Sequence, residues 1–385
     1  MKEIEDIIAA YDVAVIAGKK TALATVVHVD GSSYRRPGAR MLITEDGMLT
    51  GAISGGCLEG DALRKSLLVI MQQQPLLVTY DTSDEEDAVI GMGLGCNGII
   101  QVLIEPIDTN NKLNPIQLLK QVVAQKQKAV LVTLFNLADK RAAQPGTCLL
   151  LGEEGIIKGT DIPLQDMLLK AAKSVLISEQ SSFHQYTREE WQFTAFTEFI
   201  PPAISLVIIG AGNDVFPLVN MAGILGWQTT VIDGRPAYAK KERFPAACSV
   251  ILAKPEEAVK VLPVNDRTAI VLMTHNYNYD LAMMEALADK KVGYIGVLGP
   301  KKKLDRMMAE LTTKGIVFTD EQCAVVHGPV GLDIGAETAE EIALSILAEI
   351  KTVFAHAQAH SLKNSNAPIH NRSALVIEQV QLPGN

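Results

Sequence analysis

The residues after Pro202 alternate between short apolar strands and helices, and this alternation limits the folds open to that part of the chain. Residues 204–209 form a continuous apolar stretch, and similar stretches recur at 229–232, 250–252, 269–273 and 292–297. Strands that alternate with helices predict a parallel sheet covered on both faces. We therefore expect an α/β chain whose carboxyl-terminal half is a Rossmann-like, doubly wound parallel-sheet domain.

The turn after the first of these strands is typical of a dinucleotide-binding turn. Gly210 and Gly212 precede the first helix, and Asp233 ends the second strand. In Rossmann domains such glycines let a pyrophosphate approach the backbone, and an acid at this offset binds a ribose hydroxyl. The alternatives are a tight turn retained without a nucleotide, and an Asp233 that pairs with Arg235. His275, at the same edge of the sheet, is either functional or a polar loop residue.

The amino-terminal half carries two glycine-dense loops that each contain a cysteine. In the first, Ser54-Gly55-Gly56-Cys57-Leu58-Glu59, the cysteine lies at the amino end of a helix expected over 58–73. Unpaired N–H groups and the helix dipole favour negative charge there and lower the pKa of a thiol. A thiolate beside free amides can meet a soft metal or an anion. Glu59 is either a counter-charge in this site or an ordinary acid at a helix start.

The second loop, Gly93-Leu94-Gly95-Cys96, lies directly before a strand expected over 99–105. Two such loops in one half of the chain favour a shared site in which Cys57 and Cys96 face a metal. The alternative for each loop is a tight turn with a buried, inert cysteine.

A loop over residues 31–38 precedes the first cysteine loop in the sequence, and Arg35, Arg36 and Arg40 lie in it or beside it. The planar guanidinium group binds two phosphate oxygens at once. We take Arg36 as a candidate phosphate ligand; a solvated loop is the alternative.

The composition excludes several classes of partner. A formal net charge of -9 argues against broad binding to nucleic acid or to lipid surfaces. The five scattered cysteines form neither a disulfide framework nor a zinc motif. We see no signal peptide and no run near the roughly 18 apolar residues that a membrane span needs. We expect a cytoplasmic protein that binds neither nucleic acid nor membranes.

The length of 385 residues predicts more than one domain. Pro201-Pro202 interrupts regular structure and marks the expected boundary. We predict a mixed α/β domain over 1–200, the Rossmann-like domain over 201–352, and a loose tail over 353–385.

Several of these motifs, in this order, resemble the XdhC/CoxI family. The likeness extends to about residue 352. Members of this family are accessory factors for xanthine dehydrogenase, carbon monoxide dehydrogenase and related molybdoenzymes. Besides the two cysteine loops, the matching stretches are Gly31-Ser32-Ser33-Tyr34-Arg35-Arg36-Pro37-Gly38-Ala39, Gly210-Ala211-Gly212, Asp233-Gly234-Arg235-Pro236, Gly296-Val297-Leu298-Gly299 and Gly331-Leu332-Asp333-Ile334-Gly335-Ala336.

The resemblance implies a chaperone, with no catalytic residues, that binds the molybdenum cofactor, helps its sulfuration and delivers it to a xanthine dehydrogenase-type molybdoenzyme. The cofactor is a pyranopterin with a dithiolene-held metal and a phosphate. Cys57 and Cys96 would meet the metal region, and Arg36 the phosphate. The candidate cofactor-binding residues in this half are Arg36, Ser54, Gly55, Gly56, Cys57, Glu59, Gly95 and Cys96.

The resemblance also implies a homodimer, and it leaves a cysteine desulfurase as a further candidate partner. Two other functions stay open. One is an NAD(P)-dependent oxidoreductase that uses the Rossmann domain, although Val215 replaces the third glycine and no hydride-transfer constellation is visible. The other is an interaction scaffold whose Rossmann domain holds a partner protein.

Overall fold

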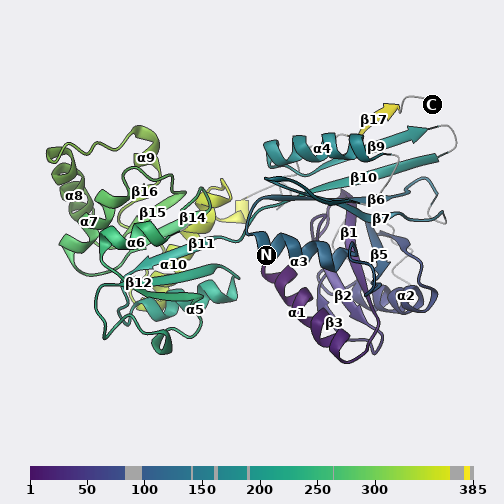
Figure 1. Cartoon of the computed structure of the whole chain (residues 1–385), viewed down its shortest axis with the longest axis horizontal. Helices are drawn as coiled ribbons and strands as arrows, with labels where there is room; N and C mark the ends of the chain where they lie inside the picture. Colours follow the sequence, from purple (N-terminus) through teal and green to yellow (C-terminus); the bar gives the residue numbers. More distant parts are fainter. Residues whose placement is uncertain are drawn as a thin grey trace. The chain divides into compact units, whose positions relative to one another are not determined.

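The computed structural model describes residues 1–82, 98–139, 142–159, 164–188, 191–262, 264–364 and 377–381. The chain divides into two compact units (Figure 1). The first comprises Glu3–Pro202 together with the tail from Lys363, and the second comprises Ala203–Leu362. No helix in these described stretches is long and apolar enough to cross a membrane.

The first unit contains an antiparallel five-stranded sheet, called here sheet A. Along β1, Ala22, Ala24 and Val26 pack toward α2 (Glu59–Gln72), whereas Leu23 and Val27 pack on the opposite face. This alternation follows from the period-2 geometry of a strand that is buried on both faces. The strands, in spatial order, are β3 (Leu49–Gly51), β2 (Arg40–Thr44), β1 (Thr21–Gly31), β5 (Gly98–Pro106) and β4 (Leu76–Asp81).

A second sheet, sheet B, packs on sheet A through apolar residues such as Val27, Leu103 and Phe196. Helix α4 (Gln165–Ser178) covers its outer face (Figure 1). The inner space also holds α1 (Lys2–Ile16) and α3 (Pro115–Gln125). The strands, in spatial order, are β17 (Ile377–Gln381), β9 (Ser182–Arg188), β10 (Trp191–Ile200), β6 (Ala129–Phe135), β7 (Gly146–Gly152) and β8 (Gly155–Gly159).

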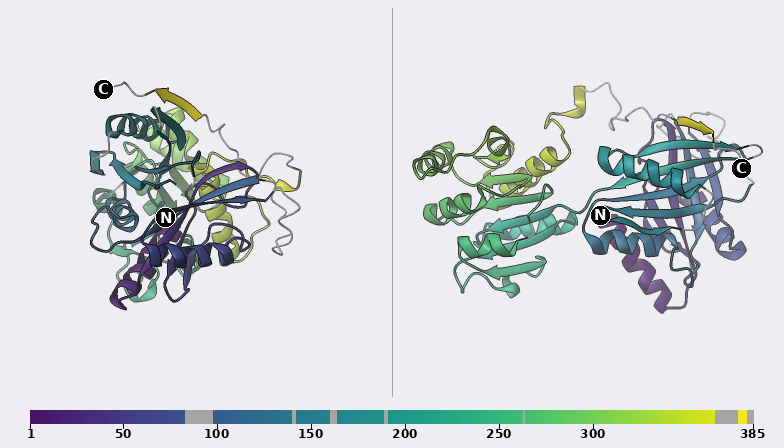
Figure 2. Two further views of the ribbon diagram at one scale, coloured as in Figure 1. Left: turned by 90° about the vertical axis from the view of Figure 1, so that its right-hand side faces the viewer. Right: turned by 45° about the horizontal axis from the view of Figure 1, so that its top comes forward.

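The first unit is therefore layered as α2, sheet A, sheet B and α4, and Figure 2 shows it from two further directions. The tail differs from the expectation of a loose segment in one place. Its strand β17 adds in parallel to the edge strand β9, with Ile377 opposite Phe183.

The second unit is built on a six-stranded parallel sheet. Counted from β11, its strand order is 3-2-1-4-5-6, which is that of a Rossmann fold. The predicted fold class is thus confirmed. In spatial order the strands are β13 (Ser249–Leu252), β12 (Gln228–Asp233), β11 (Ser205–Ile209), β14 (Thr268–Leu272), β15 (Tyr294–Val297) and β16 (Val326–His327).

Helices cover both faces of this sheet, and each face has its own apolar core. One face packs against α5 (Val215–Ile224) and α10 (Ala339–Phe354). Val215, the first residue of α5, is buried in the core on this face. The other packs against α6 (Pro255–Val261), α7 (Tyr277–Leu287) and α8 (Lys301–Thr313), and the short α9 (Asp320–Ala324) precedes β16.

Candidate functional site

The loops that carry the predicted cofactor site emerge at one edge of sheet A. Strands β1, β3 and β4 end at this edge, and β2 and β5 begin there, as their registers require. Gly31 lies opposite Gly98, and Thr82 and Gly98 hydrogen-bond to each other. The basic loop 32–39 and the cysteine loop 52–58 therefore share this edge with Thr82 and Gly98, which flank the segment 83–97 in the sequence. Gly95 and Cys96 themselves lie outside the described residues.

Ser54 organises the first cysteine loop. Its buried hydroxyl oxygen accepts hydrogen bonds from the backbone N–H of Gly56 and of Leu58, both at 3.1 Å, and from the Cys57 thiol at 3.4 Å. The same hydroxyl donates to the Glu59 carboxylate. Glu59 Oε1 in turn accepts the Ser54 N–H at 2.8 Å. The loop is thus closed by a serine–glutamate pair that the spacing of five residues brings together.

This pairing assigns Glu59 a local role in the loop. Burial raises the pKa of its carboxyl, but the hydrogen bonds from the hydroxyl and N–H of Ser54 outweigh it and hold the pKa below its ordinary value. The ionised carboxylate also lies in the first turn of α2, where negative charge is favoured. Glu59 therefore fixes the turn that presents Cys57.

Cys57 lies directly before α2, because Leu58 is the N-cap residue and the helix begins at Glu59. Its side chain is half-buried and packs against the core between α2 and sheet A. Gly56 has φ +111° with open space around it, so the backbone conformation is what requires glycine there. The thiol therefore lies in the turn before α2, where it is partly exposed to solvent and partly packed against the core.

The three arginines of the basic loop have different roles in the structure. Arg35 forms an ion pair with Glu3. Arg40 is buried and forms an ion pair with Glu198 of β10, which joins sheet A to sheet B. Burial lowers the pKa of Arg40, but Glu198 outweighs it and raises that pKa above its ordinary value. Arg36 is exposed to solvent.

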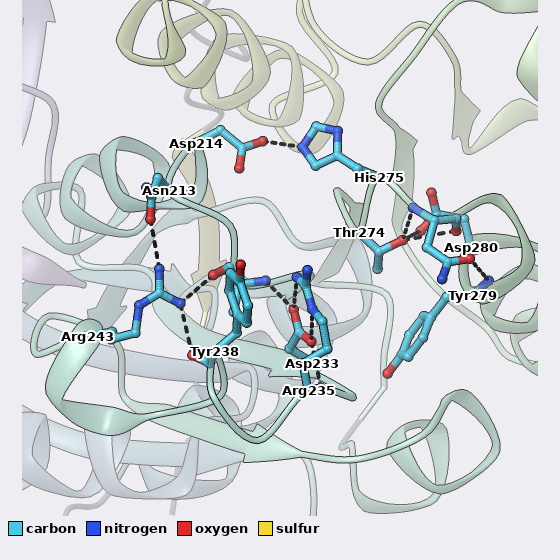
Figure 3. Close-up of polar contacts among 12 residues, drawn as sticks. Asn213, Asp214, Asp233, Arg235, Tyr238, Arg243, Thr274, His275, Tyr279 and Asp280 are labelled. Atoms are coloured by element: carbon cyan, nitrogen blue, oxygen red, sulfur yellow. Dashed lines mark hydrogen bonds and ion pairs between the residues drawn. The ribbon is translucent and has the colours of Figure 1, made fainter.

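In the second unit, the glycine turn lies at the carboxyl edge of the parallel sheet (Figure 3). Gly210 has φ +118°, and a Cβ there would collide with the carbonyl of Met273. Asp233 accepts the Ala211 N–H at 2.8 Å, and Arg235 Nε and Nη2 at 2.9 and 2.7 Å. Burial raises the pKa of Asp233, but these hydrogen bonds outweigh it and lower that pKa. The pairing of Asp233 with Arg235 is therefore present, and ribose binding by Asp233 stays a prediction.

A hydrogen bond between Asp214 and His275 lies on the other side of the turn (Figure 3). Asp214 Oδ2 lies 2.8 Å from His275 Nε2, and an added Cβ on Gly212 would meet the Asp214 carboxylate. Arg243 Nη1 donates to the carbonyl of Ala211 at 2.6 Å. His275 has φ 55°, which is uncommon for a residue with a Cβ. Side chains of this chain therefore contact the turn at Ala211 and at Gly212.

Two protein-family models match the chain. One describes the XdhC and CoxI family and matches residues 14–81; the other describes the XdhC Rossmann domain and matches residues 206–350. A probable xanthine dehydrogenase subunit of Bacillus subtilis (strain 168) is 34% identical over 333 residues, which is 86% of this chain and 92% of that protein. The chain belongs to the XdhC and CoxI family.

Two further relatives of this XdhC-type chain extend the comparison. The molybdenum cofactor insertion chaperone PaoD of Escherichia coli (strain K12) is 24% identical over 348 residues, 90% of this chain and 88% of its own. A crystal structure described as a xanthine dehydrogenase from Bacillus halodurans superposes with a TM-score of 0.72 at 30% identity. It covers 92% of this chain and 97% of its own.

Within the residues that the structure describes, no three histidine, cysteine or acidic side chains converge as ligands for a metal ion.

Two residues of the XdhC-type site have roles that the sequence did not reveal. The sequence did not indicate the central role of Ser54, since its partner Glu59 was expected only as a helix-start acid or counter-charge. Tyr34, the one aromatic residue of the loop 31–39, was not recognised as part of the site. An aromatic side chain among glycine, serine and arginine residues was the signal that could have found it.

Proposed function

We propose that this chain binds the molybdenum cofactor at the edge of sheet A and delivers it to a xanthine dehydrogenase-type molybdoenzyme. Membership of the XdhC and CoxI family supports this, as does the name of the PaoD relative, a molybdenum cofactor insertion chaperone. The structural observation that carries the proposal is the shared edge. The basic loop and the Cys57 loop emerge there together, beside Thr82 and Gly98, which flank in the sequence the segment that contains Cys96.

The residues at this edge suit the parts of the cofactor, which we treat as cargo. Cys57 offers a soft sulfur ligand, which suits the metal–dithiolene region. Cys96 is separated by one residue from Gly98, which lies at the same edge, and we propose it as the second sulfur ligand. Exposed Arg36 suits the phosphate, because its planar donors bind two oxygens at once. Ser54 and Glu59 hold the loop in shape and need not touch the cargo.

Further steps rest on the family resemblance alone. We propose that the cofactor is carried in its sulfurated form, with a cysteine desulfurase as sulfur donor. We also propose that the chain acts as a homodimer in the cytoplasm.

The test is the amount of cofactor that the purified protein retains. The chain is expressed in a host that makes the cofactor, and pterin fluorescence is measured after denaturation. We expect Cys57→Ala and Cys96→Ala each to reduce the retained pterin about tenfold or more. Cys248→Ala is the matched control, because this exposed cysteine lies in the second unit. If neither loop variant differs from the control, the thiol site is wrong.

The second candidate function is an NAD(P)-dependent oxidoreductase, which the strand order and the Gly210 turn favour. Two features weigh against it. The Asp214 carboxylate covers Gly212, and Asp233 is engaged by Arg235. Titration with NAD(H) and NADP(H) decides the matter. Micromolar binding that is lost in Asp233→Ala would support this function, and no binding by the wild-type chain would rule it out.

A further inference from the structure

An exposed aromatic ring lies directly on the glycine turn of the proposed cofactor site. Tyr34 is 67% exposed, which is high for a tyrosine, yet its ring packs on Gly55. A Cβ built on Gly55 would lie 3.3 Å from two atoms of the ring and 3.6 Å from a third. The contact involves the ring atoms next to the point of attachment, and the residue as a whole remains largely exposed beside the Cys57 turn.

The backbone on both sides of Tyr34 is anchored. Ser33 Oγ donates to the carbonyl of Arg35 at 2.6 Å, and the Arg35 side chain forms an ion pair with Glu3 of α1. Gly38 N–H donates to the carbonyl of Val26 at 2.8 Å, which ties the loop to β1. Before the ring, Gly31 pairs with Gly98 of β5, so the loop is held on both sides of Tyr34. An exposed ring on an anchored loop is a preorganised contact, since little conformational freedom is left to lose on binding.

The absence of a side chain at position 55 leaves room for the ring. No positive φ requires glycine there, in contrast to Gly56, and a Cβ at position 55 would press on Tyr34. The two adjacent glycines thus have different physical roles. Gly56 shapes the turn that presents Cys57, and Gly55 admits the ring to that turn.

We propose that Tyr34 is a stacking platform for the pterin ring system of the cargo, and this inference rests on the proposed function. A planar, polarisable heterocycle gains most from a flat aromatic partner, in the same way that nucleobases stack on aromatic side chains. The edge then has one contact for each part of the cofactor. Sulfur ligands meet the metal–dithiolene region, Arg36 meets the phosphate, and Tyr34 recognises the pterin.

The test uses 6-hydroxymethylpterin, which has the ring system but no dithiolene, metal or phosphate. Its fluorescence is titrated with cofactor-free wild-type chain and with Tyr34→Ala, Tyr34→Leu and Tyr34→Phe. We expect quenching on binding to wild type and to Tyr34→Phe with Kd values within about twofold of each other. Loss of one aromatic stack should weaken binding by Tyr34→Ala and Tyr34→Leu about 5- to 150-fold. Tyr238→Ala is the control, since this tyrosine is 39% exposed and lies in the second unit.

The same preparations, expressed with the cofactor, are assayed for retained pterin, which separates the two ideas. If the wild-type chain retains cofactor but Tyr34→Ala or Tyr34→Leu binds the probe as well as wild type, the stacking inference is overturned and the proposed function stands. The same holds if the wild-type chain does not bind the probe at all. If the wild-type chain retains no cofactor, the proposed function fails and the inference fails with it. Thermal unfolding of each variant checks that exposed Tyr34 is not needed for folding.

Discussion

Replacing Arg40 by methionine should destabilise the first unit strongly. The Arg40 side chain is 3% exposed and that of Glu198 is 12% exposed, and Arg40 Nη1 lies 3.1 Å from Glu198 Oε1. The same nitrogen donates to the carbonyl of Gly38 at 2.8 Å. Removal of Arg40 leaves the Glu198 carboxylate buried without its counter-charge, and buried Glu105 also loses a nearby positive charge.

The magnitude follows from the cost of an unpaired buried charge. Breaking a buried ion pair by removing one partner costs about 3–5 kcal/mol of unfolding free energy. For a unit of this size, about 1 kcal/mol shifts the Tm by roughly 2–4 °C, so the expected fall is about 6–20 °C. Differential scanning calorimetry of the full chain measures it, and we expect the transition of the first unit to move while that of the second stays.

Two matched variants make this prediction sharp. Lys19→Met removes an exposed ion pair to Asp46 in the same unit, with side chains 39% and 42% exposed. An exposed ion pair contributes little to stability, so the Tm of this variant should stay close to that of the wild type. The double variant Arg40→Met/Glu198→Leu replaces the whole buried pair by apolar groups and should regain most of the lost stability. The reasoning is refuted if Arg40→Met costs no more than Lys19→Met, or if the double variant is no more stable than Arg40→Met.

Two of the other three predictions concern the Cys57 turn, and the third concerns a buried ion pair of the second unit. The pKa of Glu59 is lower in the folded chain than in the unfolded chain. The contribution of Glu59 to the free energy of unfolding is therefore present above the unfolded pKa of about 4.3 and is lost as pH falls through the folded pKa. In urea unfolding at a series of pH values, Glu59→Gln should flatten the dependence of the unfolding free energy on pH in this range. Lys303→Met should destabilise the second unit by about 3–5 kcal/mol, since Lys303 Nζ lies 2.6 Å from fully buried Asp280, and equal urea midpoints would contradict this. Gly56→Ala should lower the free energy of unfolding by about 1–2 kcal/mol through backbone strain, because Gly56 has a positive φ. Gly60→Ala, within α2, should not destabilise the first unit. Equal effects of the two variants in urea unfolding would show that the positive φ of Gly56 is not what requires glycine.

The regular elements could be predicted because their signals are local. The apolar stretch that became β11 and the helix that became α5 are set by residues adjacent in the chain, where strand and helix periods are visible. The same holds for the position of Cys57 directly before α2. The XdhC and CoxI motifs are likewise continuous stretches of sequence, and the family comparisons confirmed the resemblance. Domain limits and the cofactor-site residues, including Gly95 and Cys96, stay predictions.

The roles of the polar side chains could not be predicted in the same way. Arg35, Arg36 and Arg40 are equivalent in the sequence, yet one pairs with Glu3, one is exposed, and one is buried on Glu198, which lies 158 residues away. Spacing along the chain does not encode which sheets will pack together. An ion pair between two sheets is therefore visible only in the folded molecule.

The sequence by itself determined that this chain has a Rossmann unit, a Gly-Gly-Cys turn before a helix, and the motifs of its family. Only the tertiary structure decided that the basic loop and the Cys57 loop share one edge of sheet A with Thr82 and Gly98, because that depends on the antiparallel registers of five strands. It also decided that Tyr34 lies on Gly55, and that Asp214 covers the glycine turn of the second unit. Each of these contacts joins residues brought together by strand pairing or loop geometry, and neither composition nor periodicity carries that information.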